Sequence, residues 1–307
     1  MFETTFFSSI LLPVIIGLTM LGIGTSLSVS DFRNIFRFPR GIGVGLLGQL
    51  VLLPLIAILI AYISPLSPEL KAGIVLVASC PGGATSNLIV HLFRGNVAMS
   101  VSFTIVNSFL TIISIPAWVY VGLYLFMGEG QSVSLPLKDF VIDIVLMTVV
   151  PCTLGILLNS RFPDTITKAR RTLDIIMPVL MAFGMVAAIF FEKKAEGVAL
   201  SPQIFFKTLP WVLLLNLGGM LCAYLLAVLF RLGNRNRMTI SVEVGLHNTV
   251  LAIFIATASY MLNSPVMAIP AAVYAMFTFF TAVGWAAYVR RHALSFAWRS
   301  RKRRPKK

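Results

Sequence analysis

Cys80-Pro81-Gly82-Gly83-Ala84-Thr85-Ser86-Asn87 interrupts one of the long apolar runs of this chain. The residues here that disfavour a helix are Pro81, Gly82 and Gly83, so the stretch predicts a helix break. A break frees backbone carbonyl and N–H groups, which are tolerated at membrane depth only where they line a cavity or are buried in protein. Thr85, Ser86 and Asn87 add side-chain oxygens there. A kinked helix with small residues at a packing interface is the alternative interpretation.

The composition around this stretch is that of a membrane protein. Of 307 residues, 58% are hydrophobic and 12% are charged, against about 45–50% and about 25% in soluble domains. Disorder is excluded because it needs low hydrophobicity. The apolar runs are continuous rather than alternating, which predicts helices and not a β-barrel. We therefore expect an all-α polytopic protein with nine transmembrane helices, at about 6–28, 41–63, 72–90, 97–122, 140–158, 175–191, 204–230, 240–261 and 266–289.

Basic residues predict how these spans are oriented. Of the 25 Lys and Arg residues, 20 lie in the odd-numbered loops and the tail 290–307. The positive-inside rule then puts this basic tail in the cytoplasm and the N-terminus outside, in a multi-pass protein of the inner (plasma) membrane. The net charge of +14 is placed to meet anionic membrane lipids, not nucleic acid. Three widely spaced cysteines indicate neither a disulfide framework nor a zinc site.

A second polar cluster, Glu243-Val244-Gly245-Leu246-His247-Asn248-Thr249, lies in the eighth predicted span. Glu243 is the only acid well inside a hydrophobic run, and a lone buried carboxylate needs a partner or must be protonated. A cation is a natural partner. His247 shares a face with Glu243 wherever the helix is intact, so a Glu–His pair that only joins helices is the alternative. Gly245 is a candidate break residue.

The two clusters lie five spans apart and therefore in oppositely directed spans. This arrangement is typical of inverted-repeat secondary transporters, in which half-helix N-termini face anions and unwound carbonyls face cations. Ser100 and Thr104 share one face of the fourth span, and Gln49 lies in the second. All three supply oxygens suited to a hard cation. Each alone is more typical of an ordinary helix position, where Ser and Thr bond to their own backbone.

The stretches CPGGATSN (80–87), RGNVAMSVSFT (94–104) and EVGLHN (243–248) resemble the bile acid:sodium symporter family, and most closely its bacterial organic-anion branch. The resemblance implies two inverted repeats that form a core domain, with two crossing discontinuous helices, and a panel domain. It implies one transporter domain over 1–289, followed by the tail. The core would comprise about 41–122 and 204–289, and the panel about 6–28 and 140–191.

The resemblance also implies two sodium sites and a substrate site. The first sodium site maps onto Ser86, Asn87, Ser100, Thr104 and Glu243. The second maps onto Gln49, Glu243, the carbonyls of Val244 and Leu246, and His247. The family pattern has a glutamine where this chain has His247, and imidazole offers nitrogen instead of oxygen, so the second site departs from the pattern. Substrate-binding positions map onto Thr85 and Asn248.

The function expected from the sequence is sodium-coupled import of an organic anion by alternating access. Bile acids, pantoate-like acids and keto acids all remain candidate substrates. Proton-coupled or sodium-independent transport by the same fold is the alternative, since histidine titrates near pH 6.5. A channel is a further option. An enzyme is not expected, because the sequence shows no rhomboid-type, aspartyl-protease or Asp-rich prenyltransferase motif. Apart from sodium, the substrate and lipids, we expect no organic cofactor, nucleic acid or obligate protein partner.

Overall fold

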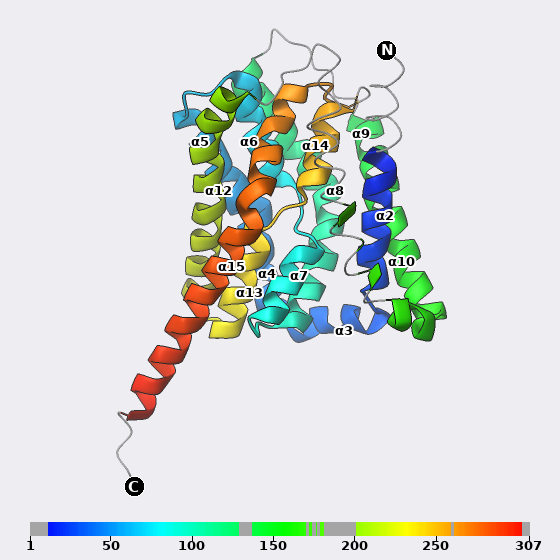
Figure 1. The fold of residues 1–307 in the computed structure, drawn as a ribbon, viewed down its shortest axis with the longest axis vertical. Helices are drawn as coiled ribbons and strands as arrows, with labels where there is room; N and C mark the ends of the chain where they lie inside the picture. The colour runs from blue at the N-terminus through cyan, green and yellow to red at the C-terminus, as the bar shows by residue number, and fades with distance from the viewer. Residues whose placement is uncertain are drawn as a thin grey trace.

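The computed structural model describes residues 12–128, 137–169, 201–258 and 261–302, with a few further positions between 172 and 180 (Figure 1). Within these ranges every regular element is a helix and no strand occurs. The helices follow one another in this order: α2 (Leu12–Thr25), α3 (Val29–Arg37), α4 (Pro39–Leu47), η2 (Gly48–Leu52), α5 (Leu53–Ile63), α6 (Pro68–Ser79), α7 (Ala84–Leu92), α8 (Val97–Met127), α9 (Leu137–Ile144), η3 (Val145–Val149), α10 (Val150–Arg161), α12 (Pro202–Leu229), α13 (Asn234–Gly245), α14 (Thr249–Thr257) and α15 (Pro265–Lys302).

Six helical stretches in the described residues are long and apolar enough to cross a membrane, which makes the protein polytopic. They are Pro39–Ile63, Val97–Met127, Val141–Arg161, Pro202–Leu229, Asn234–Thr257 and Pro265–Arg291. A shorter apolar helix covers Pro13–Thr25. The span expected at 72–90 consists of the two short helices α6 and α7. The span expected at 175–191 lies almost wholly outside the described residues, so the total of nine stays a prediction.

Helix α3 occupies a segment that the hydropathy pattern assigns to a loop. It runs crosswise to the spanning helices, between the end of α2 and the lower end of α7 (Figure 1). Arg33 and Arg37 are exposed, and Phe36 is 86% exposed. A short helix with basic and aromatic side chains on its surface is typical of the membrane interface. The first basic loop is therefore a structured connection between α2 and α4.

Helices α2 and α10 pack against each other through glycines, so their backbones come unusually close. A Cβ on Gly24 would lie 2.8 Å from the carbonyl carbon of Cys152, and one on Gly155 would lie 2.7 Å from the Thr25 nitrogen. Near the end of this contact, Asn159 Nδ2 donates to the Leu27 carbonyl over 2.8 Å. In a membrane, no hydrophobic driving force favours contact between helices over contact with lipid. Membrane helices therefore associate through close packing of small residues.

We predict that Gly155→Ala forces α2 and α10 apart. The new methyl group would meet backbone atoms of α2, which cannot move without shifting the whole helix. Overpacking of this kind costs about 1–3 kcal/mol, so the melting temperature in detergent should fall by several degrees. Gly218→Ala is the matched control, because a Cβ there meets nothing within 4 Å. Equal melting temperatures for both variants would contradict the close contact.

Candidate functional site

Each of the two polar stretches forms a helix break in the structure. Helix α6 ends at Ser79 and α7 begins at Ala84, while α13 ends at Gly245 and α14 begins at Thr249. Asn248 starts α14 as its N-cap, since its Oδ1 accepts from the Leu251 nitrogen over 3.0 Å. Proline and glycine explain the first break, because neither sustains a helix. The second begins after Gly245, where no proline is present.

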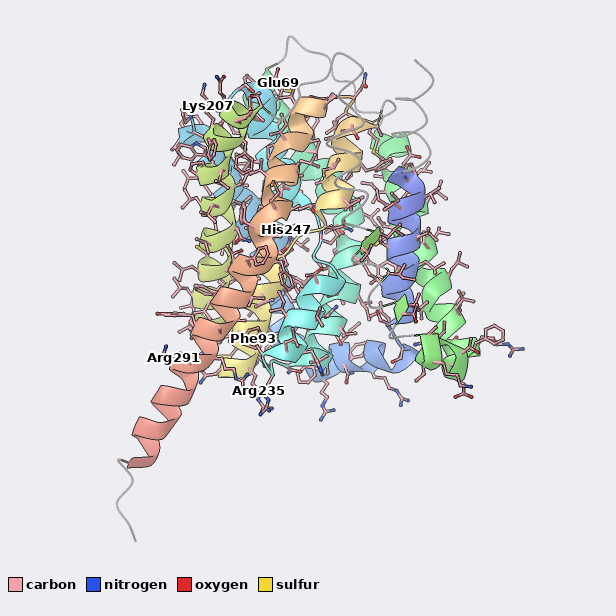
Figure 2. The ribbon with its side chains drawn as sticks, viewed as in Figure 1. Glu69, Phe93, Lys207, Arg235, His247 and Arg291 are labelled. Carbon is pink, nitrogen blue, oxygen red and sulfur yellow. The ribbon has the colours of Figure 1, made fainter. Side chains whose placement is uncertain are left out.

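The two breaks touch each other. The Asn248 nitrogen donates to the Pro81 carbonyl over 2.7 Å, and His247 Nδ1 lies 3.2 Å from the Cys80 carbonyl oxygen. Gly82, in the first break, permits this contact because it has no side chain: a Cβ there would lie 3.1 Å from the Leu246 carbonyl oxygen. His247 lies about midway between the end of the molecule that carries Glu69 and Lys207 and the end that carries Arg235 and Phe93 (Figure 2). Four helix ends therefore meet at the centre of the protein.

Glu243 lies beside this contact and is fully buried. Its Oε2 accepts from Ser86 Oγ over 3.0 Å and from Thr104 Oγ1 over 3.2 Å. Its Oε1 is hydrogen-bonded to Ser100 Oγ. Asn87 completes the group, with its Oδ1 2.6 Å from Ser100 Oγ and its Nδ2 3.4 Å from Thr104 Oγ1. The structure thus brings together all five residues predicted for a first sodium site, from α7, α8 and α13.

This cluster has too few protons for its oxygens. Each of its three hydroxyl groups has two acceptors within hydrogen-bond distance but only one proton to donate. The donors to Glu243 are all neutral, so none of them balances the carboxylate charge. Uncompensated buried charge is costly. An excess of oxygen acceptors around one carboxylate is the environment that a hard cation prefers.

Two residues of the predicted second site, Gln49 and His247, meet at the Cys80 carbonyl. Gln49 Nε2 donates to it over 3.0 Å, and His247 Nδ1 is also within hydrogen-bond distance. Gln49 Oε1 and His247 Nε2 are both buried without a partner among the described residues. The Leu246 carbonyl faces Gly82, whereas the Val244 carbonyl lies 4.0 Å from the Cβ that Gly219 of α12 would carry. One oxygen and one nitrogen are thus left for a further ligand.

The two predicted substrate residues differ in their surroundings. Thr85 lies partly exposed in the first turn of α7. Asn248 is 2% exposed, and its Oδ1 is already occupied as the cap of α14. Asn248 therefore holds the second break in place through its side-chain oxygen, which keeps one lone pair, and both this oxygen and its amide nitrogen can serve another partner.

Sequence reasoning missed three residues that hold the end of α13. The carbonyl of Gly245, freed by the break, accepts from Asn216 Nδ2 and Tyr274 OH, each over 2.7 Å, and from Thr278 Oγ1 over 3.3 Å. Asn216 Oδ1 in turn accepts from Thr281 over 2.6 Å. Asn216 stands out as an amide in the apolar run 204–230, which is the signal that could have identified it.

Trp118 of α8 was also missed, and it stabilises the helix next to Gln49. Its Nε1 donates to the Leu50 carbonyl over 2.8 Å. In a regular helix this carbonyl would accept from residue 54, but Pro54 has no N–H group. The wider turn η2 precedes Pro54, and such π-turns are frequent at functional sites. Trp118 replaces the hydrogen bond that Pro54 cannot make.

We predict that Trp118→Phe leaves the Leu50 carbonyl unpartnered, at a cost of about 1–3 kcal/mol. The melting temperature should fall, and ligand binding that depends on Gln49 should weaken several-fold. Thermal melts with and without sodium measure both effects. The control is Trp211→Phe, the same change at a partly buried position of α12. If both variants behave alike, the hydrogen bond to Leu50 has no special role.

A cleft lies beside the Glu243 cluster, between α8 on one side and α2, η3 and α10 on the other. About 390 Å³ of space lies within it when the part open to the outside is counted, and its polar lining consists of Thr104, Ser108 and Thr148. Aliphatic and aromatic side chains, among them Met20 and Phe109, line the rest. Thr104 lines the cleft and also donates a hydrogen bond to Glu243. Only the Thr104 side chain would therefore separate a molecule in the cleft from the Glu243 carboxylate.

A protein-family model for the sodium bile acid symporter family matches residues 13–199 of the sequence. The chain belongs to the sodium bile acid symporter family. It is 30% identical over 267 residues to the uncharacterized sodium-dependent transporter YocS of Bacillus subtilis (strain 168), covering 86% of this chain and 78% of that protein. It is 29% identical to the hepatic sodium/bile acid cotransporter of Rattus norvegicus, with 82% of this chain and 68% of that protein covered.

A plant relative is the probable chloroplastic sodium/metabolite cotransporter BASS1 of Arabidopsis thaliana. It is 29% identical over 266 residues, which cover 84% of this chain and 62% of that protein. These relatives are sodium-dependent transporters and not enzymes, which confirms the prediction of a transporter and the assignment to this family. Membership makes sodium the implied coupling ion.

Proposed function

We propose that this protein is a symporter that uses sodium to import an organic anion. The observation that carries the proposal is the buried Glu243 carboxylate, which receives hydrogen bonds from three hydroxyl groups that have too few protons to satisfy the oxygens around them. One sodium ion bound by Ser86, Asn87, Ser100, Thr104 and Glu243 would remove both the excess of acceptors and the unbalanced charge. Oxygen ligands from side chains suit a hard cation of this kind.

The substrate anion would bind in the cleft that Thr104 shares with the sodium site. The first turns of α7 and α14 lie at the break level, and helix N-termini attract anions. Sodium at Glu243 favours an anion nearby, and by linkage the anion favours sodium equally. The cleft lining combines a few hydroxyls with many apolar groups, which fits a carboxylate with an apolar body.

Alternating access would come from motion between two groups of helices. We assign α2, α9, η3 and α10 to the panel and α4 to α8 with α12 to α15 to the core. Arg235 and Arg291 lie at one end of the molecule, and Glu69 and Lys207 lie at the other (Figure 2). Since α3 and the tail add more basic residues to the Arg235 end, we place that end in the cytoplasm of a plasma-membrane protein.

Thermal stability of the purified protein in a sodium titration tests the proposal. A ligand that binds only the folded state stabilises it in proportion to the logarithm of its concentration. We expect the melting temperature to rise with the logarithm of the sodium concentration once that exceeds the dissociation constant, and to stay constant with potassium at the same ionic strength. Carboxylates screened in sodium should then add a further rise, and uptake into proteoliposomes should follow the sodium gradient.

Proton-coupled transport by the same fold remains the rival, because His247 contacts the first break through the Cys80 carbonyl. The same titration at two pH values separates them. No response to sodium, together with uptake driven by a proton gradient, would establish the rival in place of sodium coupling.

A further inference from the structure

Helix α8 carries a line of polar side chains that begins in the Glu243 cluster and continues beyond it. Its members recur every three or four residues and so share one face of the helix; they are Ser100, Thr104, Asn107, Thr111 and Ser114. From Ser100 to Ser114 the line covers about 21 Å at 1.5 Å per residue. Further along α8, a Cβ on Gly122 would contact Val75 of α6, and the first turn of α6 carries Glu69. The line therefore leads from the cluster toward the Glu69 end.

Beyond Thr104, the line contains polar atoms that have no hydrogen-bond partner among the described residues. Asn107 is fully buried, and both its Nδ2 and its Oδ1 lack a partner among the described residues. Ser114 Oγ is also buried without a partner there. Thr111, between them, bonds to its own helix at the Ser108 carbonyl. Buried amide groups without partners are rare in folded proteins, and each calls for water or an ion.

A further unpartnered oxygen lies on η2, the turn that continues α4. A Cβ on Gly41 would contact Met99 and one on Gly45 would contact Phe103, so α4 and α8 run in the same direction with a constant offset. Gln49 follows on η2, where the wider turn ends this register, and its Nε2 donates to the Cys80 carbonyl over 3.0 Å. Gln49 Oε1 is buried and lacks a partner among the described residues. A second amide oxygen that accepts no hydrogen bond from the described residues therefore lies inside the core, beside the first break.

We propose that this line is the path by which the coupling cation, with its water, moves between the Glu243 cluster and the Glu69 end, and that Asn107 is a transit ligand on it. The inference rests on the proposed sodium site at Glu243. A cation that has lost part of its water shell in a membrane needs an oxygen at every few ångströms, and the spacing of the line supplies one at each turn. A hydroxyl bonded to its own helix still has lone pairs to offer a passing ion.

Rates of sodium binding test the path separately from the site. A transit ligand changes association and dissociation together and leaves the equilibrium midpoint in place. Purified protein is mixed rapidly with sodium chloride, and the fluorescence of its four tryptophans is followed. The final fluorescence at each sodium concentration gives the equilibrium midpoint. In Asn107→Leu we expect both rates to fall about tenfold or more, the effect of one lost polar contact to a charge, and the midpoint to stay within about twofold.

Ser114→Ala is a second variant that makes a smaller change on the same line and should slow both rates in the same direction. The matched control is Thr208→Val, which removes an equally buried, unpartnered hydroxyl from α12 and should leave the rates unchanged. Unaltered rates in Asn107→Leu would overturn the path, and so would a midpoint that rises with the dissociation rate, which would make Asn107 an equilibrium ligand. If wild-type protein shows no sodium response, the proposed function itself fails, before any variant is compared.

Discussion

Replacing Glu243 by glutamine abolishes the sodium-specific rise in melting temperature and lowers sodium-driven uptake by about 100-fold or more. Glutamine keeps the size of the side chain but removes its charge and one acceptor, so a cation loses its only charged ligand in the cluster of Ser86, Ser100 and Thr104. Interactions with a charged group are worth about 1.5–3 kcal/mol each, and 1.4 kcal/mol is a tenfold change in binding. Thermal melts in sodium and in potassium measure the first effect, and proteoliposome uptake measures the second.

The same variant should melt in potassium at a temperature at least as high as wild type. Without sodium the buried carboxylate has only neutral donors, and removing an uncompensated charge relieves its desolvation cost. Glu69→Gln, the same change at the first turn of α6, is the control and should keep the full sodium response. A sodium-specific shift that survives in Glu243→Gln would remove Glu243 from the site.

The features that the sequence predicts well are those that depend on local chemistry. Pro81 and the glycines after it cannot continue a helix in any surroundings, so the first break could be placed without a structure. Glu243 could be identified because a single acid in an apolar run is costly wherever the run packs. The grouping of Ser100 and Thr104 with Glu243 needed the family resemblance, since hydroxyls in membrane helices mostly bond to their own backbone.

Other features depend on which helices become neighbours, and the sequence pattern contains no sign of that. The Gly245 carbonyl is satisfied by Asn216 of α12 and Tyr274 of α15, each 29 positions away along the chain. Trp118 reaches Leu50 across 68 positions of the chain. Helix α3 was assigned to a loop because hydropathy detects spans and not interfacial helices. Each of these features is determined by a tertiary contact or by the membrane surface, and not by the local sequence.

Direct contact between the breaks offers a simple physical link between the two ligands. The first break contains the Pro81 carbonyl, and the second donates to it through Asn248. Sodium held by Ser86, at the start of α7, and by Glu243, near the end of α13, would fix both breaks at once. Ordering the breaks would also order the helix N-termini that attract an anion. The contact between the breaks is therefore enough to couple sodium binding to anion binding.

That contact depends on Gly82, and Gly82→Val should therefore eliminate the sodium response. A Cβ on Gly82 would lie 3.1 Å from the Leu246 carbonyl oxygen, 3.3 Å from the Glu243 carbonyl oxygen and 3.4 Å from Glu243 Oε2. The two further methyl groups of valine have no space there and would push the breaks apart. We expect the melting temperature in sodium to fall to that in potassium, because the ligands on α7 and α13 no longer meet.

Gly83→Val is the matched control, because the two glycines are adjacent and both belong to the break. A Cβ on Gly83 meets nothing within 4 Å, and its backbone is extended, with φ −139° and ψ −172°, a conformation that suits a β-branched residue. The Gly83→Val variant should keep its sodium-dependent stabilisation. Melting temperatures measure this and uptake does not, because the open space beside Gly83 can be part of the substrate site. Equal loss in both variants would mean that the break needs glycine for flexibility, and equal retention would mean that the two breaks can separate without releasing sodium.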